Sequence, residues 1–330
     1  MSRWMLLACV LVAACGTSDP AVVHLDGSPD AVRAVASGPA GDTLAIGGAS
    51  AFGLASLQRG HDGTWTNAEG VPAFDAHAKL FSRGEHYYAI SSSQLYVLTG
   101  STWNAFPLPT GVTADTELGI DDAGLLYGLE LDADGGGAVL SLMPGDNRWT
   151  EIVGSRPIGV NATSFVVDGP GRVTWTAPDT GVITVVNGVR STAVDCSTNA
   201  RLGGCGTELT TYGVDSRHEG VYLVLACNET KRAMMAVSDT DPDLESEEPV
   251  PGGERTCRSF GADKDGGRPI VATYDADGND AKLYSFTKSW NTLDGADPTL
   301  FYAYGGDTLY GWAEMPIGDA PRGIDQISVP

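Results

Sequence analysis

The chain has 330 residues, with 42 acidic against 20 basic residues and a formal net charge of −22 at pH 7. Such an acidic surface argues against nucleic acid and anionic lipid headgroups as partners. The 43 glycines and 18 prolines are many for a helical protein, and short apolar or alternating runs bounded by turn residues dominate. The composition therefore predicts an all-β fold.

The N-terminus has the pattern of an export signal. A basic start at Arg3 is followed by the apolar run Trp4–Ala14, and small residues stand directly before Cys15. The run is shorter than the ~20 apolar residues that span a bilayer. Leu11–Cys15 resembles a bacterial lipoprotein signal. The resemblance implies cleavage before Cys15 and lipid, such as palmitate, on its thiol and new amino group.

This resemblance sets the expected organisation: a signal peptide at 1–14, a lipid-anchored tether at 15–20 and a β domain at 21–330. The alternative is an ordinary signal with a chance cysteine, but Gly16–Pro20 is a polar tether with turn formers. Two or more acyl chains anchor a protein almost permanently. We therefore expect a protein anchored in the bacterial cell envelope. Gly16 resembles the signals that permit outer-membrane sorting in Gram-negative bacteria.

The rest of the chain repeats. Each unit begins with a strand, a tight turn rich in Gly and Asp, and a second strand. Successive units start about 40–50 residues apart, a spacing typical of propeller blades. The seven strand pairs are predicted at Val32–Ile46, Ala76–Ile90, Glu117–Leu129, Ser164–Thr176, Leu209–Leu225, Ser259–Thr273 and Leu300–Trp312.

A third strand follows the pair in most units, so that each unit has room for four short antiparallel strands. These third strands are predicted at Leu95–Thr99, Ala138–Met143, Gly181–Val186, Lys231–Val237 and Lys282–Thr287.

An outer strand bearing a tryptophan completes several units. Trp65, Trp103, Trp149 and Trp290 each stand between a turn and a Gly or Pro exit. We expect each ring to pack on the neighbouring sheet, the alternative being four unrelated core tryptophans. In one unit the acidic run Asp239–Glu248 takes this place. It predicts a solvated blade edge, with a cation or partner patch as the alternative.

The last unit lacks a fourth strand, because only Gly323–Val329 remains after Leu309–Glu314. The segment Ala21–Asp26 precedes the first full unit and is free to supply the missing strand. Seven four-stranded units closed in this way resemble the β-propeller superfamily, whose radial repetition leaves only short edges. The chain has neither WD40 nor kelch motifs, so the resemblance implies an architecture and no functional family.

Four cysteines remain once Cys9 leaves with the signal and Cys15 is lipidated. An even number in an exported chain favours disulfides, and the predicted register places all four at one face of the ring. We favour Cys196–Cys205 and Cys227–Cys257 over the other two pairings. A zinc site is the competing interpretation, but the wide spacings lack the close ligand pairs of zinc sites built from four cysteines.

Two aspartate-rich loops are weak candidates for calcium, because alternate carboxylates on a tight loop supply hard oxygen ligands. Neither loop has EF-hand spacing, and the alternative is a hairpin turn, for which Asp-Gly is favoured chemistry. Apart from calcium, the sequence indicates no cofactor. The candidate ligands are Asp132, Asp134, Asp275, Asp277, Asn279 and Asp280.

The sequence contains no nucleophile elbow, phosphate loop or dinucleotide fingerprint, and its five histidines are scattered. These features favour a non-catalytic binding or scaffolding module with a protein or glycan partner. One alternative is an envelope glycan hydrolase or lyase with its site at the axial mouth of the propeller. Another is a structural envelope protein without a ligand.

Overall fold

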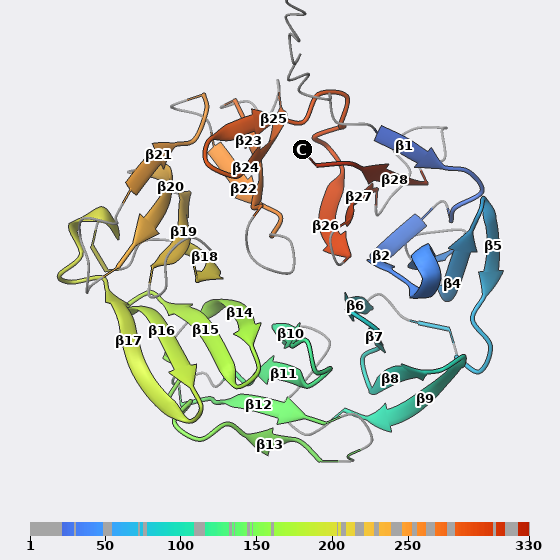
Figure 1. Ribbon diagram of the computed structural model, residues 1–330, viewed down its shortest axis with the longest axis horizontal. Coiled ribbons are helices and arrows are strands. Elements are labelled where there is room, and N and C mark those ends of the chain that lie inside the picture. The colour runs from blue at the N-terminus through green and yellow to red at the C-terminus, as the bar shows by residue number, and fades with distance from the viewer. Residues whose placement is uncertain are drawn as a thin grey trace, which may run out of the picture.

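The computed structural model describes 22–29, 31–48, 55–71, 73–74, 78–108, 116–131, 134, 136–143, 146, 148–159, 162–202, 204–205, 209–214, 221–227, 231–238, 246–252, 256–261, 268–275, 281–305, 308–313 and 323–329. These residues form a ring of seven four-stranded antiparallel sheets, a seven-bladed β-propeller (Figure 1). The fold predicted from the repeat is confirmed. In the described ranges the helical segments are two 3-10 turns, and none of their helices could cross a membrane.

The first three blades each use four consecutive strands, ordered from the axis outward (Figure 1). Blade 1 contains β2 (Ala31–Ser37), β3 (Thr43–Gly48), β4 (Ser56–His61) and β5 (Thr64–Asn67). Blade 2 contains β6 (Lys79–Arg83), β7 (His86–Ile90), β8 (Gln94–Thr99) and β9 (Thr102–Pro107). Blade 3 contains β10 (Leu118–Ile120), β11 (Leu126–Leu129), β12 (Val139–Leu142) and β13 (Thr150–Glu151).

Blades 4 to 6 follow the same order. Blade 4 contains β14 (Thr163–Gly169), β15 (Arg172–Ala177), β16 (Gly181–Val186) and β17 (Val189–Asp195). Blade 5 contains β18 (Leu209–Val214), β19 (Tyr222–Cys227), β20 (Arg232–Val237) and β21 (Ser246–Pro249). Blade 6 contains β22 (Thr256–Ser259), β23 (Ile270–Tyr274), β24 (Lys282–Phe286) and β25 (Trp290–Thr292).

Blade 7 joins the two ends of the chain. From the axis outward it contains β26 (Phe301–Gly305), β27 (Thr308–Trp312), β28 (Ile324–Ile327) and β1 (Val22–Leu25). In the antiparallel pair of β1 and β28, Val22 lies opposite Ile327 and Leu25 opposite Ile324. Just after β1, the Ser28 hydroxyl accepts a hydrogen bond from the Ile324 amide at 2.9 Å. The predicted closure of the ring by the N-terminal strand is confirmed.

The hydrophobic core is divided into layers between neighbouring blades. A middle strand such as β3 or β19 is buried over almost its whole length, because its sheet is covered on both faces. Outer strands such as β21 are exposed throughout. In the layer between blades 3 and 4, Leu129 of β11 and Trp175 of β15 belong to one cluster and are both inaccessible to solvent.

The outer tryptophans lie in these layers, as predicted. Trp103 of β9 belongs to the cluster between blades 1 and 2, and Trp149, just before β13, to the cluster between blades 2 and 3. Trp65 of β5 and Trp290 of β25 pack in the same way against the preceding blade. In blade 5 the end of the acidic run supplies the exposed strand β21, whereas 239–245 lie outside the described residues.

Two disulfides link consecutive blades at the pairings favoured from the strand register. Cys196, just after β17, is bonded to Cys205 with a Cα–Cα distance of 4.9 Å. Cys227 at the end of β19 is bonded to Cys257 in β22, with a Cα–Cα distance of 5.7 Å. The second disulfide therefore links blade 5 to blade 6, and the first ties the end of blade 4 to the connection that leads into blade 5.

Deletion of Val22–Leu25 tests the closure. We expect the free energy of unfolding to fall by about 2–3 kcal/mol, since two half-buried apolar side chains are lost. The exposed edge of β28 should also promote self-association. Urea denaturation and size-exclusion chromatography measure the two effects. The control is Val23→Thr, which changes a side chain of β1 that is 53% exposed. Equal stability of deletion and control would contradict the closure.

Candidate functional site

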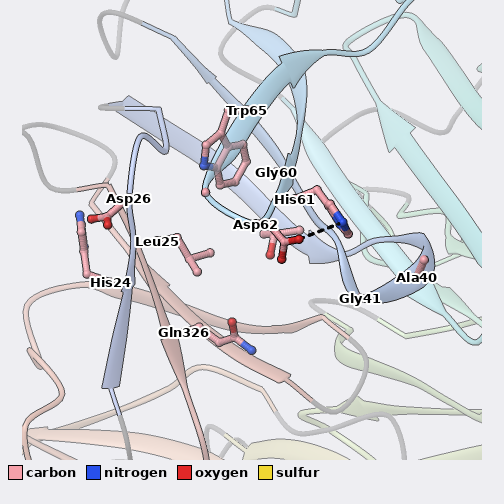
Figure 2. Close-up of a pocket in the computed structure, with 12 residues that line it drawn as sticks. His24, Leu25, Asp26, Ala40, Gly41, Gly60, His61, Asp62, Trp65 and Gln326 are labelled. Atoms are coloured by element: carbon pink, nitrogen blue, oxygen red, sulfur yellow. Dashed lines mark ion pairs between the residues drawn. The ribbon is translucent and has the colours of Figure 1, made fainter.

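A polar pocket of about 520 Å³ lies where blade 7 meets blade 1 (Figure 2). One wall comes from the outer strands β1 and β28 of blade 7. The other comes from the 3-10 turn Pro39–Gly41 and the turn between β4 and β5 in blade 1. We call it the seam pocket. Its lining residues are His24, Leu25, Asp26, Ala40, Gly41, Thr43, Gly60, His61, Asp62, Gly63, Trp65 and Gln326.

A buried carboxylate organises the blade 1 wall. The Asp42 side chain is inaccessible to solvent, and its two oxygens face Arg59 Nε and His61 Nδ1, the latter at 2.5 Å. Arg59 and His61 alternate along β4 and so reach the same face of the sheet. A buried carboxylate requires such pairing, because an isolated charge loses its hydration. The pairing orients the His61 ring, whose Nε2 lies 3.4 Å from Asp62 Oδ2.

The outer strands of blade 7, which form the other wall, carry a second histidine–aspartate pair on the face turned away from blade 1. His24 on β1 lies opposite Asp325 on β28, and His24 Nδ1 is 2.9 Å from Asp325 Oδ1. The neighbouring Gln326 extends into the pocket on the side opposite Trp65 (Figure 2). Within the part of the chain that the structure describes, no hydrogen bond to the Gln326 amide is observed. This wall therefore offers an amide for hydrogen bonding to a ligand.

Trp65 forms the aromatic part of the lining, and Gly60 allows its position. A Cβ atom at Gly60 would lie 2.6 Å from Trp65 Cε2 and 2.7 Å from Cζ2, too close for any side chain. The indole thus packs directly on the backbone of β4. Trp65 also packs against the core between blades 7 and 1, which fixes the ring at the pocket wall.

Asp42→Ala tests whether the buried carboxylate holds the blade 1 wall. We expect a loss of about 1–3 kcal/mol in the free energy of unfolding, less than for a fully buried ion pair. The loss is limited because the Arg59 and His61 side chains are 48% and 60% exposed. Chemical denaturation measures it. Asp62→Ala removes a nearby carboxylate that is 91% exposed and should change stability by less than about 0.5 kcal/mol. Similar losses in both variants would refute this role.

Another polar centre lies at the inner strands, where Arg83 ends β6. Its side chain is 8% exposed, and Nη1 donates to the carbonyls of Ile120 and Val167, each at 3.0 Å. Nε donates to Asp122 Oδ1 at 2.7 Å. One guanidinium therefore links blades 2, 3 and 4. A guanidinium, with several donors in a planar fork, suits this bracing role.

Tyrosines on second strands fasten one blade to the next, a role that the sequence analysis missed. Tyr88 of β7 donates to the carbonyl of Gly124 in the first turn of blade 3. Tyr127 of β11 donates to Asp121 Oδ2 at 2.9 Å and accepts from the Gly171 amide of blade 4 at 3.1 Å. The recurrence of tyrosine in second strands was the available signal. Burial, together with Asp121, raises the pKa of Tyr127 to about 12.

The raised pKa of Tyr127 predicts a loss of stability in alkali. Above pH 10 an unfolded tyrosine ionises, whereas the folded Tyr127 keeps its proton until pH about 12. The unfolded state then binds fewer protons, so the free energy of unfolding falls as pH rises through this window. Tyr127→Phe should reduce that slope by up to about 1.4 kcal/mol per pH unit. Urea denaturation at several alkaline pH values measures it, and identical slopes would contradict the prediction.

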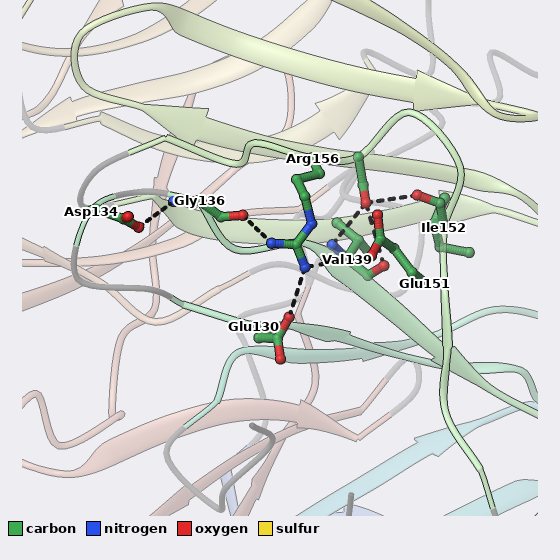
Figure 3. A network of polar contacts seen from close by, with 8 residues as sticks. Glu130, Asp134, Gly136, Val139, Glu151, Ile152 and Arg156 are labelled. Atoms are coloured by element: carbon green, nitrogen blue, oxygen red, sulfur yellow. Dashed lines mark hydrogen bonds and ion pairs between the residues drawn. The ribbon is translucent and has the colours of Figure 1, made fainter. Parts of the chain in front are cut away.

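The first of the two candidate calcium loops is occupied by an arginine (Figure 3). Arg156 Nη2 lies 3.4 Å from both Glu130 Oε2 and Glu151 Oε2, and Nη1 donates to the Gly136 carbonyl. Asp134 Oδ1 accepts from the Gly136 amide at 3.0 Å, as in a tight turn. The guanidinium thus supplies a cation beside this loop, paired with Glu130 and Glu151, and Asp134 serves the turn.

Of the second candidate calcium loop, the structure describes Asp275. Asp275 follows β23 and is half-buried. The described residues contain no group of three or more His, Cys, Asp or Glu side chains able to hold a metal ion. Calcium binding stays a prediction, as does lipid on Cys15. The remaining candidates lie outside the described residues: Cys15, Asp132, Asp277, Asn279 and Asp280.

No family model matches the chain, and no curated protein matches its sequence. Similar solved structures include YCF48 from Cyanidioschyzon merolae (TM-score 0.59, 11% identity, covering 93% of this chain and 98% of that one). Virginiamycin B lyase from Staphylococcus aureus has a TM-score of 0.58 at 10% identity, covering 94% and 99%. Oligogalacturonate lyase from Vibrio parahaemolyticus has a TM-score of 0.56 at 11% identity, covering 95% and 99%. At these identities the likeness shows the fold alone.

Proposed function

We propose that the chain is a lipid-anchored protein of the bacterial cell envelope whose propeller is a non-catalytic binding module. The observation that carries the proposal is the seam pocket. It is polar, its described lining contains no lysine or arginine, and the buried Asp42 behind one wall is already paired with Arg59 and His61. A preformed polar pocket is suited to holding a ligand by hydrogen bonds and packing.

The closure of the ring supports the anchoring part of the proposal. Val22, the first residue of β1, follows Cys15 by seven residues. Such a segment spans at most about 25 Å. A lipid on Cys15 would therefore hold the ring by the rim of blade 7, beside the seam pocket. A ligand in the envelope would then lie within reach of the pocket.

The fold is compatible with binding and with catalysis. A similar solved structure is described as YCF48 bound to D1 peptide, with a TM-score of 0.59 at 12% identity. Two lyases share the same architecture. A propeller thus accommodates either role, and the choice depends on the chemistry of the site.

The second candidate function is a glycan hydrolase or lyase, and one observation favours it. His61 Nδ1 is held by the buried Asp42, an arrangement that orients an imidazole as a general base. This pair lies at the seam and not at the axial mouth, where the sequence analysis expected an enzyme site. In the binding proposal the same pair is a positioning element of the wall.

Cys15→Ala tests the anchor. We expect the full chain to incorporate labelled palmitate and to sediment with membranes, because a diacylated or triacylated cysteine stays in the bilayer. Cys15→Ala should lose the label, whereas the control Cys9→Ala, which changes the other N-terminal cysteine, should keep it. Label that persists in Cys15→Ala would overturn the anchoring proposal.

Binding and catalysis are separated with residues 19–330, which contain every strand of the ring. We expect this domain to capture a saturable partner from envelope extracts and to leave added oligosaccharides uncleaved, as judged by mass spectrometry. Cleavage that disappears in His61→Asn would establish the enzyme alternative. If no partner is captured and no cleavage is seen across conditions, both functions are contradicted and a structural role remains.

A further inference from the structure

We infer that the seam pocket binds an uncharged polyhydroxyl ligand, namely a neutral sugar residue of an envelope glycan. This inference rests on the proposed function as a binding module and specifies the ligand class. The pocket volume of about 520 Å³ falls in the range of small-ligand sites, about 300–1,000 Å³. The chemistry of the lining selects among the ligands that would fit.

Anionic and apolar ligands do not match the lining. Among the described residues that form the pocket there is no lysine or arginine, and Arg59 behind the wall is committed to Asp42. A phosphate or carboxylate would therefore lack the fixed cation that such ligands require. Leu25 is the one aliphatic side chain larger than alanine in this lining, so an apolar molecule would meet mostly polar atoms.

Cationic ligands match poorly, because the two carboxylates that line the pocket, Asp26 and Asp62, are exposed to water. Asp42, buried behind the blade 1 wall, is paired with Arg59 and His61, and Asp62 is 91% exposed beside His61 Nε2. Surface carboxylates in water attract a cation only weakly. A metal ion would need more ligands than the described residues bring together.

A ligand with hydroxyl groups matches the uncharged hydrogen-bonding groups of the pocket lining. The Gln326 amide both donates and accepts hydrogen bonds. The Thr43 hydroxyl lies deeper, 3.5 Å from the Tyr310 hydroxyl. Backbone groups are also accessible, since at Gly41 and Gly63 nothing lies within 4 Å of the place where a Cβ would stand. A ligand with several hydroxyls can pair with such mixed donors and acceptors without bringing a charge.

Trp65 supplies the remaining feature that a sugar requires. One face of a pyranose ring carries C–H groups, and the flat indole offers an apolar surface for it. The contact of Trp65 with Gly60 fixes this surface before the ligand arrives, so little entropy is lost on binding. Trp65 and Gln326 lie on opposite sides of the pocket (Figure 2), so a ring stacked on the indole could present hydroxyls to the amide.

The test titrates residues 19–330 with a panel of neutral mono- and disaccharides of hexoses and N-acetylhexosamines. Binding is followed by NMR of 15N-labelled indole groups, with the Trp65 signal assigned by Trp65→Phe. We expect at least one sugar to shift the Trp65 signal saturably and to leave the Trp290 signal in place. Trp65→Ala and Gln326→Leu should weaken this binding about tenfold or more, the loss typical of a central contact.

Trp290→Ala is the matched control, because it removes an outer-strand tryptophan at the layer between blades 5 and 6. It should leave sugar affinity unchanged, and thermal denaturation checks that every variant is folded. The inference is overturned if no sugar shifts the Trp65 signal, or if binding persists in both Trp65→Ala and Gln326→Leu. A steep fall in affinity with added salt would also overturn it, because an uncharged ligand is insensitive to screening.

These failures differ from a failure of the proposed function. A partner captured from the envelope with equal affinity by Trp65→Ala would refute the ligand class while preserving the binding module. Glycan cleavage, or no saturable partner at all, would refute the binding module itself.

Discussion

The pairing of β1 with β28 is the contact on which the rest of the molecule depends. Every core layer lies between two blades, so an open ring would leave one face of blade 7 and one face of blade 1 without cover. The closure brings Leu25 and Ser28 against blade 7 and next to blade 1. The seam pocket is a product of this closure, since its two walls come from the blades that the first strand joins.

Charge is distributed unevenly in this acidic chain. Several of its 20 basic residues are used inside the ring or at its loops, where they hold carboxylates and carbonyls. Arg83 links three blades, Arg59 pairs with the buried Asp42, and Arg156 occupies an aspartate-rich loop. The seam pocket is lined by two exposed carboxylates, Asp26 and Asp62, and its described lining contains no lysine or arginine. The proposed ligand would be held there by hydrogen bonding and stacking.

The proposed anchor and the seam pocket are linked by topology. In a propeller closed by its N-terminal strand, the segment before that strand leaves from an outer edge. A lipid at Cys15 would hold blade 7 by this edge and leave the other blades free. Binding at the seam would place a ligand beside the tether and close to the membrane surface. The proposed anchor and the proposed ligand would therefore involve the same part of the ring.

The sequence by itself determined the ring, its closure and the cysteine pairs. Strand alternation, Gly and Asp turns and repeat spacing are local properties, and they specify which strand follows which. The Asp42–His61 pair, the stacking of Trp65 on Gly60 and the reach of Arg83 across three blades were decided by the tertiary structure. These contacts depend on strand twist and on the angle between blades, which no spacing along the chain encodes. For the same reason the pocket appears at the seam, although sequence reasoning pointed to the axial mouth and to the aspartate loops.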